Sequence, residues 1–176
     1  MKDDKLHQGN HVANLSAQAV QRTVRLTVPT QVLPKRKTLP HTPPPWVKDD
    51  AVYFITLCAQ SRGENHFCHP KLAMQLYESV TYREHMEQWW VLLFLLMPDH
   101  VHMLVHFSEY QKMQNVISAW KRYTARHFGV QWQRDYFDHR IRSNESLQAK
   151  ADYIRHNPIR AGLVVDPDDW EFVWLK

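Results

Sequence analysis

The sequence predicts an α+β fold in which helices pack on one antiparallel sheet. From residue 51 onward, strand-like and helix-like segments alternate in the order strand, helix, strand, strand, helix, strand. The two central strands, 89–97 and 100–107, are separated by Pro98-Asp99 alone, which predicts a tight antiparallel hairpin. This order is the ferredoxin-like pattern, and we expect its helices to lie on one face of the sheet.

Residues 1–45 are expected to form a flexible basic arm ahead of a single domain at 46–176. The segment is rich in Gln, Asn, Thr and Pro and holds seven Lys and Arg residues against two Asp and Glu. Pro43-Pro44-Pro45 ends it, and a proline triplet favours an extended conformation that excludes a helix. We therefore predict no secondary structure for the arm.

The first half of the domain is predicted to contain three strands and one helix. Residues 51–59 are rich in β-branched and aromatic side chains, as is typical of a strand. Pro70 suits the first turn of a helix that runs to about residue 88. Residues 89–97 (WWVLLFLLM) are almost continuously apolar, which indicates a strand covered on both faces. Residues 100–107 (HVHMLVHF) are its hairpin partner.

The second half is predicted to contain two helices and a short strand. Residues 111–128 have apolar side chains at helical spacing, and a glycine follows them. Residues 137–141 suit a short strand. Residues 144–156 form a third predicted helix, which Pro158 should end. Residues 162–174 are expected to be a short tail.

Length and composition indicate one globular, water-soluble domain. The chain has 176 residues, 44% of them hydrophobic and 23% charged, close to the averages for folded proteins. No apolar run reaches the roughly 18 residues of a membrane span, and the N-terminus lacks the apolar stretch of a secretory signal. The two cysteines form no disulfide framework, so a cytoplasmic location is expected.

The net charge of +4 is unevenly distributed. Besides the arm, residues 112–160 carry ten Lys and Arg residues against four Asp and Glu. Clustered positive charge suits a polyanionic partner such as a nucleic acid. Ordinary solvated faces explain the same charges about equally well.

His100-Val101-His102 is a candidate metal-binding pair. Alternate residues of a strand project from one face, roughly 6.6–6.8 Å apart, so the two imidazoles can converge on one ion while Val101 faces the core. Two histidines do not complete a metal site, and a third ligand must come from elsewhere in the fold. The alternative is that both merely occupy the polar face of the strand. His106, further along that face, is expected to be structural or solvent-facing.

Tyr153 and Asn157 are one turn apart in the third predicted helix and therefore share a face. A tyrosine is a poor nucleophile at its ordinary pKa of about 10, but it becomes useful beside a metal that polarises the electrophile. Two imidazoles and the Asn157 oxygen suit Mg²⁺ or Mn²⁺. The set predicts phosphoryl transfer, in which Tyr153 attacks a phosphate and releases a 3′ hydroxyl. The structural alternative is a packed tyrosine followed by a helix-terminating asparagine.

Several segments resemble a known family. MPDHVHMLV at 97–105 resembles the HUH motif, histidine–hydrophobic–histidine, of single-strand DNA transposases. Four further segments resemble those of the REP-associated tyrosine transposases: YFITLCAQSRG at 53–63, SAWKRYTARHFG at 118–129, WQRDYFDHRIRSNES at 132–146 and YIRHNPIRAGLV at 153–164. The segments follow the family's order, and the resemblance covers about residues 40–165.

The resemblance implies an HUH nuclease fold, a divalent metal held by His100 and His102, and Tyr153 as the single nucleophile. It implies an endonuclease and strand transferase that acts on single-stranded DNA at REP-type palindromic hairpins. The reaction would pass through a 5′-phosphotyrosine intermediate and serve DNA transposition. Asn157 falls where the wider family often has a glutamine. The REP-associated branch also favours a monomer over the dimers of related transposases.

Positive and aromatic side chains in the C-terminal half are predicted to bind DNA, because cations hold phosphates and bases stack on aromatic rings. They are Lys121, Arg122, Arg126, Trp132, Arg134, Arg140, Arg142, Arg155 and Arg160. Tyr123 and Tyr136 are rival nucleophiles that packing explains as well.

Two other functions compete with the transposase interpretation. A non-catalytic regulator derived from a transposase would bind palindromic repeats without needing the histidine pair or the tyrosine. A zinc hydrolase would need a third His or Cys at ligand spacing and a nearby Glu base, and the sequence offers neither.

Overall fold

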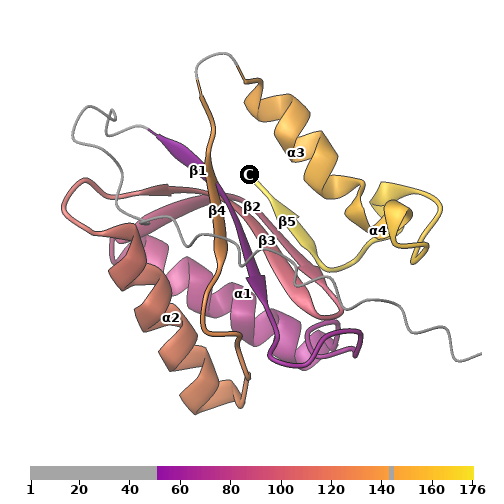
Figure 1. The fold of residues 1–176 in the computed structure, drawn as a ribbon, viewed down its shortest axis with the longest axis horizontal. Helices are drawn as coiled ribbons and strands as arrows, with labels where there is room; N and C mark the ends of the chain where they lie inside the picture. Colours follow the sequence, from indigo (N-terminus) through magenta and orange to yellow (C-terminus); the bar gives the residue numbers. More distant parts are fainter. Residues whose placement is uncertain (1–50, 143–144) are drawn as a thin grey trace, which may run out of the picture. The chain divides into compact units, whose positions relative to one another are not determined.

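The computed structural model describes residues 51–142 and 145–176, which form one sheet with helices on both of its faces (Figure 1). The predicted arm at 1–45 lies outside the described residues. The elements in chain order are β1 (Val52–Cys58), α1 (Pro70–His85), β2 (Trp89–Met97), β3 (His100–Phe107), α2 (Met113–Phe128), β4 (Phe137–Arg140), α3 (Leu147–Arg155), α4 (Asn157–Arg160), the 3₁₀ turn Pro167–Asp169 and β5 (Val173–Leu175). No helix in this part of the chain is long and apolar enough to cross a membrane.

The sheet has the strand order β4-β1-β3-β2-β5, with every neighbouring pair antiparallel. Its first four strands have the ferredoxin-like arrangement, so that prediction is confirmed. The predicted bounds of the central hairpin are also confirmed, and its tight turn sets Met97 opposite His100. Pairing of β1 with β3 places Thr56 opposite His102, which matters for the site described below.

Helices α1 and α2 cover the first face of the sheet, which carries the larger core. Strand residues Ile55, Leu57, Val101 and Met103 are fully buried there, together with Trp120 from α2. The Trp120 indole nitrogen donates to Ser79 Oγ of α1 over 2.8 Å, which satisfies the polar atoms of both helices inside the core. Gly129 ends α2 with a φ of 73°, as the sequence predicts.

Helix α3 covers the second face, so the prediction that the helices lie on one face is wrong. Its fully buried Ile154 packs in a second, smaller core with Phe54, Leu95 and Leu104. Because β2 is apolar on both faces, it supplies side chains to both cores, and this agrees with the continuous apolar run of the sequence. Periodicity within one helix cannot tell which face of a sheet it will cover.

The C-terminal region departs from the prediction in two respects. Pro158 does not end the helical path but lies in the first turn of the short helix α4, where its fixed φ and missing N–H cost nothing. The expected tail contains β5, which pairs with β2 between Leu93 and Leu95 and extends the sheet by one strand. Three residues are too few for a recognisable strand pattern. The predicted start of the third helix, Asn144, lies outside the described residues.

Candidate metal and nucleic-acid site

His100 and His102 converge on the second face of the sheet, at the start of β3. Their Nε2 atoms are 3.2 Å apart. The Nδ1 atom of His100 is 2.6 Å from Asp99 Oδ1, and that of His102 is 2.9 Å from Thr56 Oγ1. Each ring is therefore held through Nδ1 and presents Nε2 to the other ring. The predicted convergence of the pair is present, while metal binding stays a prediction.

This arrangement fits a divalent metal ion. Metal–imidazole bonds are about 2.0–2.1 Å long, so two nitrogens on one ion are roughly 2.8–3.4 Å apart for right-angled to tetrahedral bonds, and the observed 3.2 Å lies in that range. Partners such as Asp99 and Thr56 orient ligating imidazoles in known metal sites. Among residues 51–142 and 145–176, no group of three or more His, Cys, Asp or Glu side chains could hold a metal. Further ligands would have to be amide, water or substrate oxygens.

Burial keeps His102 in the protonation state that a metal ligand needs. His102 is 8% exposed. Burial lowers its pKa to about 3, assisted by the charges of His100, Arg160 and Arg62. It is therefore neutral near pH 7, with an imidazole lone pair to offer. Burial alone would raise the pKa of Asp99, but hydrogen bonds from His100 and Gly63 and the charge of Arg62 prevail and lower it.

Tyr153 lies on α3 and is 52% exposed. The Arg160 guanidinium lies 4.1 Å from the centre of its ring and also donates to its backbone carbonyl. Lys150 Nζ lies 5.7 Å from the Tyr153 ring and 5.7 Å from the ring of Phe54. The Phe54 ring centre is in turn 5.3 Å from that of His102. These contacts connect the predicted nucleophile with the predicted metal ligands on one face of the sheet.

Asn157 is not in the same helix as Tyr153, which corrects the prediction of one continuous helix. Helix α3 ends at Arg155, and Asn157 is the first residue of α4. Its Nδ2 donates to the carbonyl of Ile154 over 3.0 Å, which occupies the amide nitrogen and not the oxygen. A ligand role for the Asn157 oxygen stays a prediction.

The two rival tyrosines belong to the first face. Tyr123 lies on α2, where its ring is 4.5 Å from that of His127. Tyr136 packs against the core beneath α1 and α2, and burial raises its pKa, which makes it a weaker nucleophile. The sheet therefore separates both from the histidine pair. Of the three tyrosines considered, Tyr153 is the one on an element that covers the histidine face.

Two of the predicted DNA-binding residues are engaged inside the fold. Lys121 Nζ donates to the carbonyls of Gln133 and Arg134 over 2.6 and 2.8 Å and so anchors the loop that follows α2. Trp132 donates to Thr124 Oγ1 over 2.9 Å and stacks on Phe67, with 5.0 Å between ring centres. These contacts give both side chains a structural task in addition to any DNA contact.

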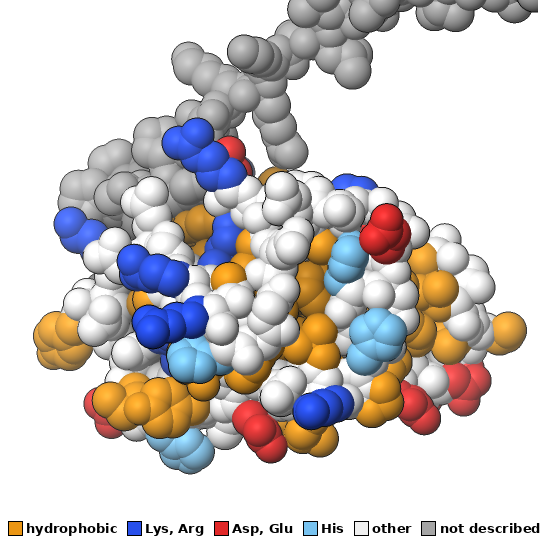
Figure 2. Space-filling view, turned by 90° about the horizontal axis from the view of Figure 1, so that it is seen from below, with side chains coloured by type: hydrophobic (Ala, Val, Ile, Leu, Met, Phe, Trp, Pro, Cys, Tyr) orange, Lys and Arg blue, Asp and Glu red, His pale blue; other side chains and the backbone are white. Residues whose placement is uncertain are grey.

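The remaining predicted cations do not form one groove. Arg122, Arg126 and Arg134 are exposed, the first two on α2. Arg140 pairs with Tyr53 in β1 and so also belongs to the first face. Seen from the side of α1 and α2, Lys and Arg side chains gather on one part of the surface (Figure 2). Arg142 is exposed after β4, Arg155 forms an ion pair with Asp168, and Arg160 covers Tyr153.

Three residues of the site escape the sequence prediction. Asp99 directly precedes His100, but a Pro-Asp pair indicates only a turn. Thr56 is 46 residues from His102, and only the β1–β3 register brings them together. Arg62 lies in the loop after β1, where its Nε is 2.8 Å from Asp99 Oδ2. Thr56 can be predicted only when the pairing of β1 with β3 is known.

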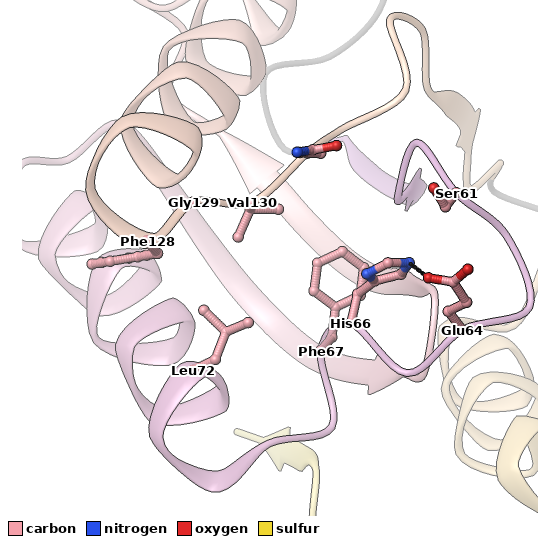
Figure 3. A pocket seen from close by; sticks show the side chains of 9 residues that line it. Ser61, Glu64, His66, Phe67, Leu72, Phe128, Gly129 and Val130 are labelled. Carbon is pink, nitrogen blue, oxygen red and sulfur yellow. Dashed lines mark ion pairs between the residues drawn. The ribbon is translucent and has the colours of Figure 1, made fainter.

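A cavity of about 330 Å³ lies between the loop after β1 and the ends of α1 and α2 (Figure 3). Phe67, Leu72 and Phe128 form part of its lining, and His66 faces Glu64 at 3.6 Å. None of the predicted site residues lines it. The cavity is therefore distinct from the histidine pair.

Comparison with known proteins gives three findings. The model of the family described as "Transposase IS200 like" matches residues 48–157. A protein of Haemophilus influenzae named as a REP-associated tyrosine transposase is 30% identical over 95 residues, in a match that covers 44% of this chain and 53% of that protein. The chain thus spans about half the length of this relative. A solved structure of a REP-associated tyrosine transposase bound to a REP hairpin matches the fold with a TM-score of 0.64 and 19% identity, over 77% of this chain and 82% of that one.

Proposed function

Because the chain belongs to the IS200-like transposase family, we propose that it is a metal-dependent enzyme that cuts and rejoins single-stranded DNA at REP-type palindromic hairpins. The family membership confirms the resemblance that the sequence motifs indicate. The substrate, the chemistry and the residue roles are our inference from the site.

One observation carries the proposal: the two Nε2 atoms converge at 3.2 Å while partners hold both Nδ1 atoms. A protein that only binds DNA gains nothing from orienting two imidazoles toward each other in this way. His100 and His102, with the Asn157 oxygen as a third ligand, would hold Mg²⁺ or Mn²⁺. When bound, the ion would act as a Lewis acid on the scissile phosphate.

Tyr153 would supply the nucleophile. Its Oη forms a bond to phosphorus, the bond from phosphorus to the 3′ oxygen breaks, and the phenolic proton ends on that oxygen. The products are a 5′-phosphotyrosine ester and a free 3′ hydroxyl. Attack of another 3′ hydroxyl on the ester reverses the step and joins two strands. Arg160 and Lys150 next to the ring favour the negative charge that develops on the phenolic oxygen and the phosphate.

A covalent-adduct assay tests the proposal. The full chain is incubated with Mn²⁺ and labelled hairpin oligonucleotides that carry randomised single-stranded flanks, and adducts are isolated on a denaturing gel and sequenced. We expect an adduct that requires the metal and that is lost in Tyr153→Phe. Tyr123→Phe, on the other face of the sheet, is the matched control and should retain it. Salt-sensitive binding without any adduct would overturn the enzyme proposal in favour of a non-catalytic regulator.

A further inference from the structure

Arg62 is connected to the histidine pair through Asp99. Its Nε is 2.8 Å from Asp99 Oδ2, and the other oxygen of Asp99 is 2.6 Å from His100 Nδ1. The Asp99 carboxylate also accepts a hydrogen bond from the Gly63 amide over 2.8 Å. These contacts fix the loop after β1 to the start of β3, directly beside His100.

The ion pair with Asp99 uses a small part of what Arg62 offers. An arginine carries five N–H donors, and the contact to Asp99 engages Nε. The Arg62 side chain is 48% exposed, whereas that of Asp99 is 13% exposed. Arg62 also forms a side-chain hydrogen bond with Cys58, yet about half of the side chain stays exposed beside the site. A guanidinium has donors enough to bind two phosphate oxygens at once.

Arg160 contacts Tyr153 of α3. It stacks over the Tyr153 ring and donates to the Tyr153 carbonyl, so it is tied to the predicted nucleophile as Arg62 is tied to a predicted metal ligand. Tyr153 is connected with the histidine pair through Lys150, whose Nζ lies 5.7 Å from the ring centres of Tyr153 and Phe54, and the Phe54 ring centre is 5.3 Å from that of His102. Arg62 and Arg160 are thus each connected with the pair by contacts of their own. They come from different segments, the loop after β1 and the helix α4.

We propose that Arg62 and Arg160 bracket the histidine pair and bind the scissile phosphate of single-stranded DNA between them. The inference rests on the proposed function and adds Arg62 to the residues that touch the substrate. Arg62 is anchored through Asp99 to His100, the predicted metal ligand, and Arg160 is anchored to Tyr153, the predicted nucleophile. Both of these groups would act on the same phosphate. When the bond from phosphorus to the 3′ oxygen breaks, the phosphate stays bonded to Tyr153 and next to Arg160, and Arg62 stays with His100 on the side of the 3′ hydroxyl.

The test measures the coupling between Arg62 and the charge of one phosphate. An intact oligonucleotide is synthesised with the sequence that the adduct assay identifies as cleaved. It carries a neutral methylphosphonate at the scissile linkage or, as a control, at a linkage in the hairpin stem. Binding is measured by fluorescence anisotropy, without added metal, to Tyr153→Phe, which keeps the ring under Arg160 and cannot react. We expect the scissile methylphosphonate to weaken binding about tenfold.

Adding Arg62→Ala should reduce that tenfold effect to about threefold, because only Arg160 then faces the phosphate charge. Arg62→Lys keeps the charge and loses the planar edge, so it should give an intermediate value. Arg122→Ala, on the first face, should weaken binding of all the oligonucleotides alike and leave the tenfold effect intact. The stem methylphosphonate should show no dependence on Arg62.

Two results overturn the inference, and they differ. If wild type forms the adduct but the scissile methylphosphonate weakens binding equally with and without Arg62, Arg62 does not touch that phosphate and the proposed function stands. If no oligonucleotide gives an adduct, there is no scissile linkage, and the proposed function falls together with the inference.

Discussion

The two faces of the sheet are built from the same strands but have different roles. On the first face, alternate residues such as Ile55, Val101 and Met103 are fully buried beneath α1 and α2. On the second face, their neighbours Thr56 and His102 form a polar site, and the apolar core is limited to the area beneath α3. A period of two residues thus lets one strand carry stability and chemistry side by side.

The comparison predicts that the effect of a mutation in β3 depends on whether the residue number is odd or even. Odd positions from 101 to 107 belong to the first face. Of the even positions, 100 and 102 form the site, and 104 belongs to the second core. Changes at odd positions should lower the free energy of unfolding, whereas changes at 100 and 102 should lower the rate of adduct formation.

The largest effect should come from removing a histidine of the pair. His100→Ala should reduce adduct formation by about a thousandfold or more, because the loss of one of two imidazole ligands dismantles the predicted metal site. The free energy of unfolding should change by less than about 1 kcal/mol, since the residue is part-exposed and outside both cores. Single-turnover adduct assays and urea unfolding give the two quantities.

The matched variant is Met103→Ala, on the first face of the same strand. It removes a fully buried side chain and should cost about 2–5 kcal/mol of unfolding free energy. Adduct formation per folded molecule should stay near that of wild type. If Met103→Ala instead lost activity while it remained folded, the two faces would be coupled, and the separation of stability from chemistry between them would be wrong.

The partners of the histidines should have the next largest effect. Thr56→Val and Asp99→Asn each leave both imidazoles in place but alter the group at Nδ1. We expect Mn²⁺ to bind about 10–100-fold more weakly, as is usual when such partners are lost. Titration followed by electron paramagnetic resonance measures the affinity directly, without DNA.

Thr81→Val is the control for this measurement, because the Thr81 hydroxyl also forms a side-chain hydrogen bond but does so within α1, where it donates to the Tyr77 carbonyl. Its Mn²⁺ affinity should equal that of wild type. Equal affinity in Thr56→Val would mean that the Thr56–His102 contact does not orient the ring.

Local patterns predicted most of the fold and half of the site. The bounds of β2 and β3 follow from an apolar run, a Pro-Asp turn and an alternating strand, which are all local signals. The sequence predicts the helix α3 but assigns it to the wrong face, because the correct face depends on the apolar surface that β1 and β2 leave uncovered. The strand β5 is too short to have a pattern, and it exists because the edge of β2 can pair with it.

The same division holds for the site. His100 and His102 are two residues apart, so a strand period brings them together and the sequence shows it. Asp99 belongs to the same motif, but the sequence indicates only a turn residue there, because the contact with the His100 ring depends on the position of that ring in the fold. Arg62 and Thr56 reach the site through contacts across 37 and 46 residues, which no local pattern contains.

A smaller effect should distinguish two neighbouring cations of the first face. Lys121 is engaged by two backbone carbonyls, so Lys121→Met should cost about 1–2 kcal/mol of unfolding free energy. Arg122 is exposed, so Arg122→Ala should leave stability unchanged within about 0.5 kcal/mol. If Arg122 contacts DNA, the variant should also lower the slope of log affinity against log salt by about 1. A slope change in Lys121→Met with unchanged stability would reverse these assignments.

The smallest effect should be the pH dependence of a contact on the second face. His139 of β4 lies 2.9 and 3.1 Å from the two carboxylate oxygens of Glu145, and this contact joins the edge strand to the segment that precedes α3. The hydrogen bond from His139 is the main cause that lowers the pKa of Glu145. A carboxylate whose pKa falls on folding stabilises the protein above its unfolded pKa of about 4.3, and this contribution is lost as the pH falls through the folded value.

Glu145→Gln should therefore be less stable than wild type at pH 7 and equal to it near pH 3. Glu78→Gln, on an exposed position of α1, should show no such convergence. If the loss of stability in Glu145→Gln were the same at both pH values, this contact would depend on the shape of the side chain and not on its charge. The second face would then owe its stability to the packing of α3 alone.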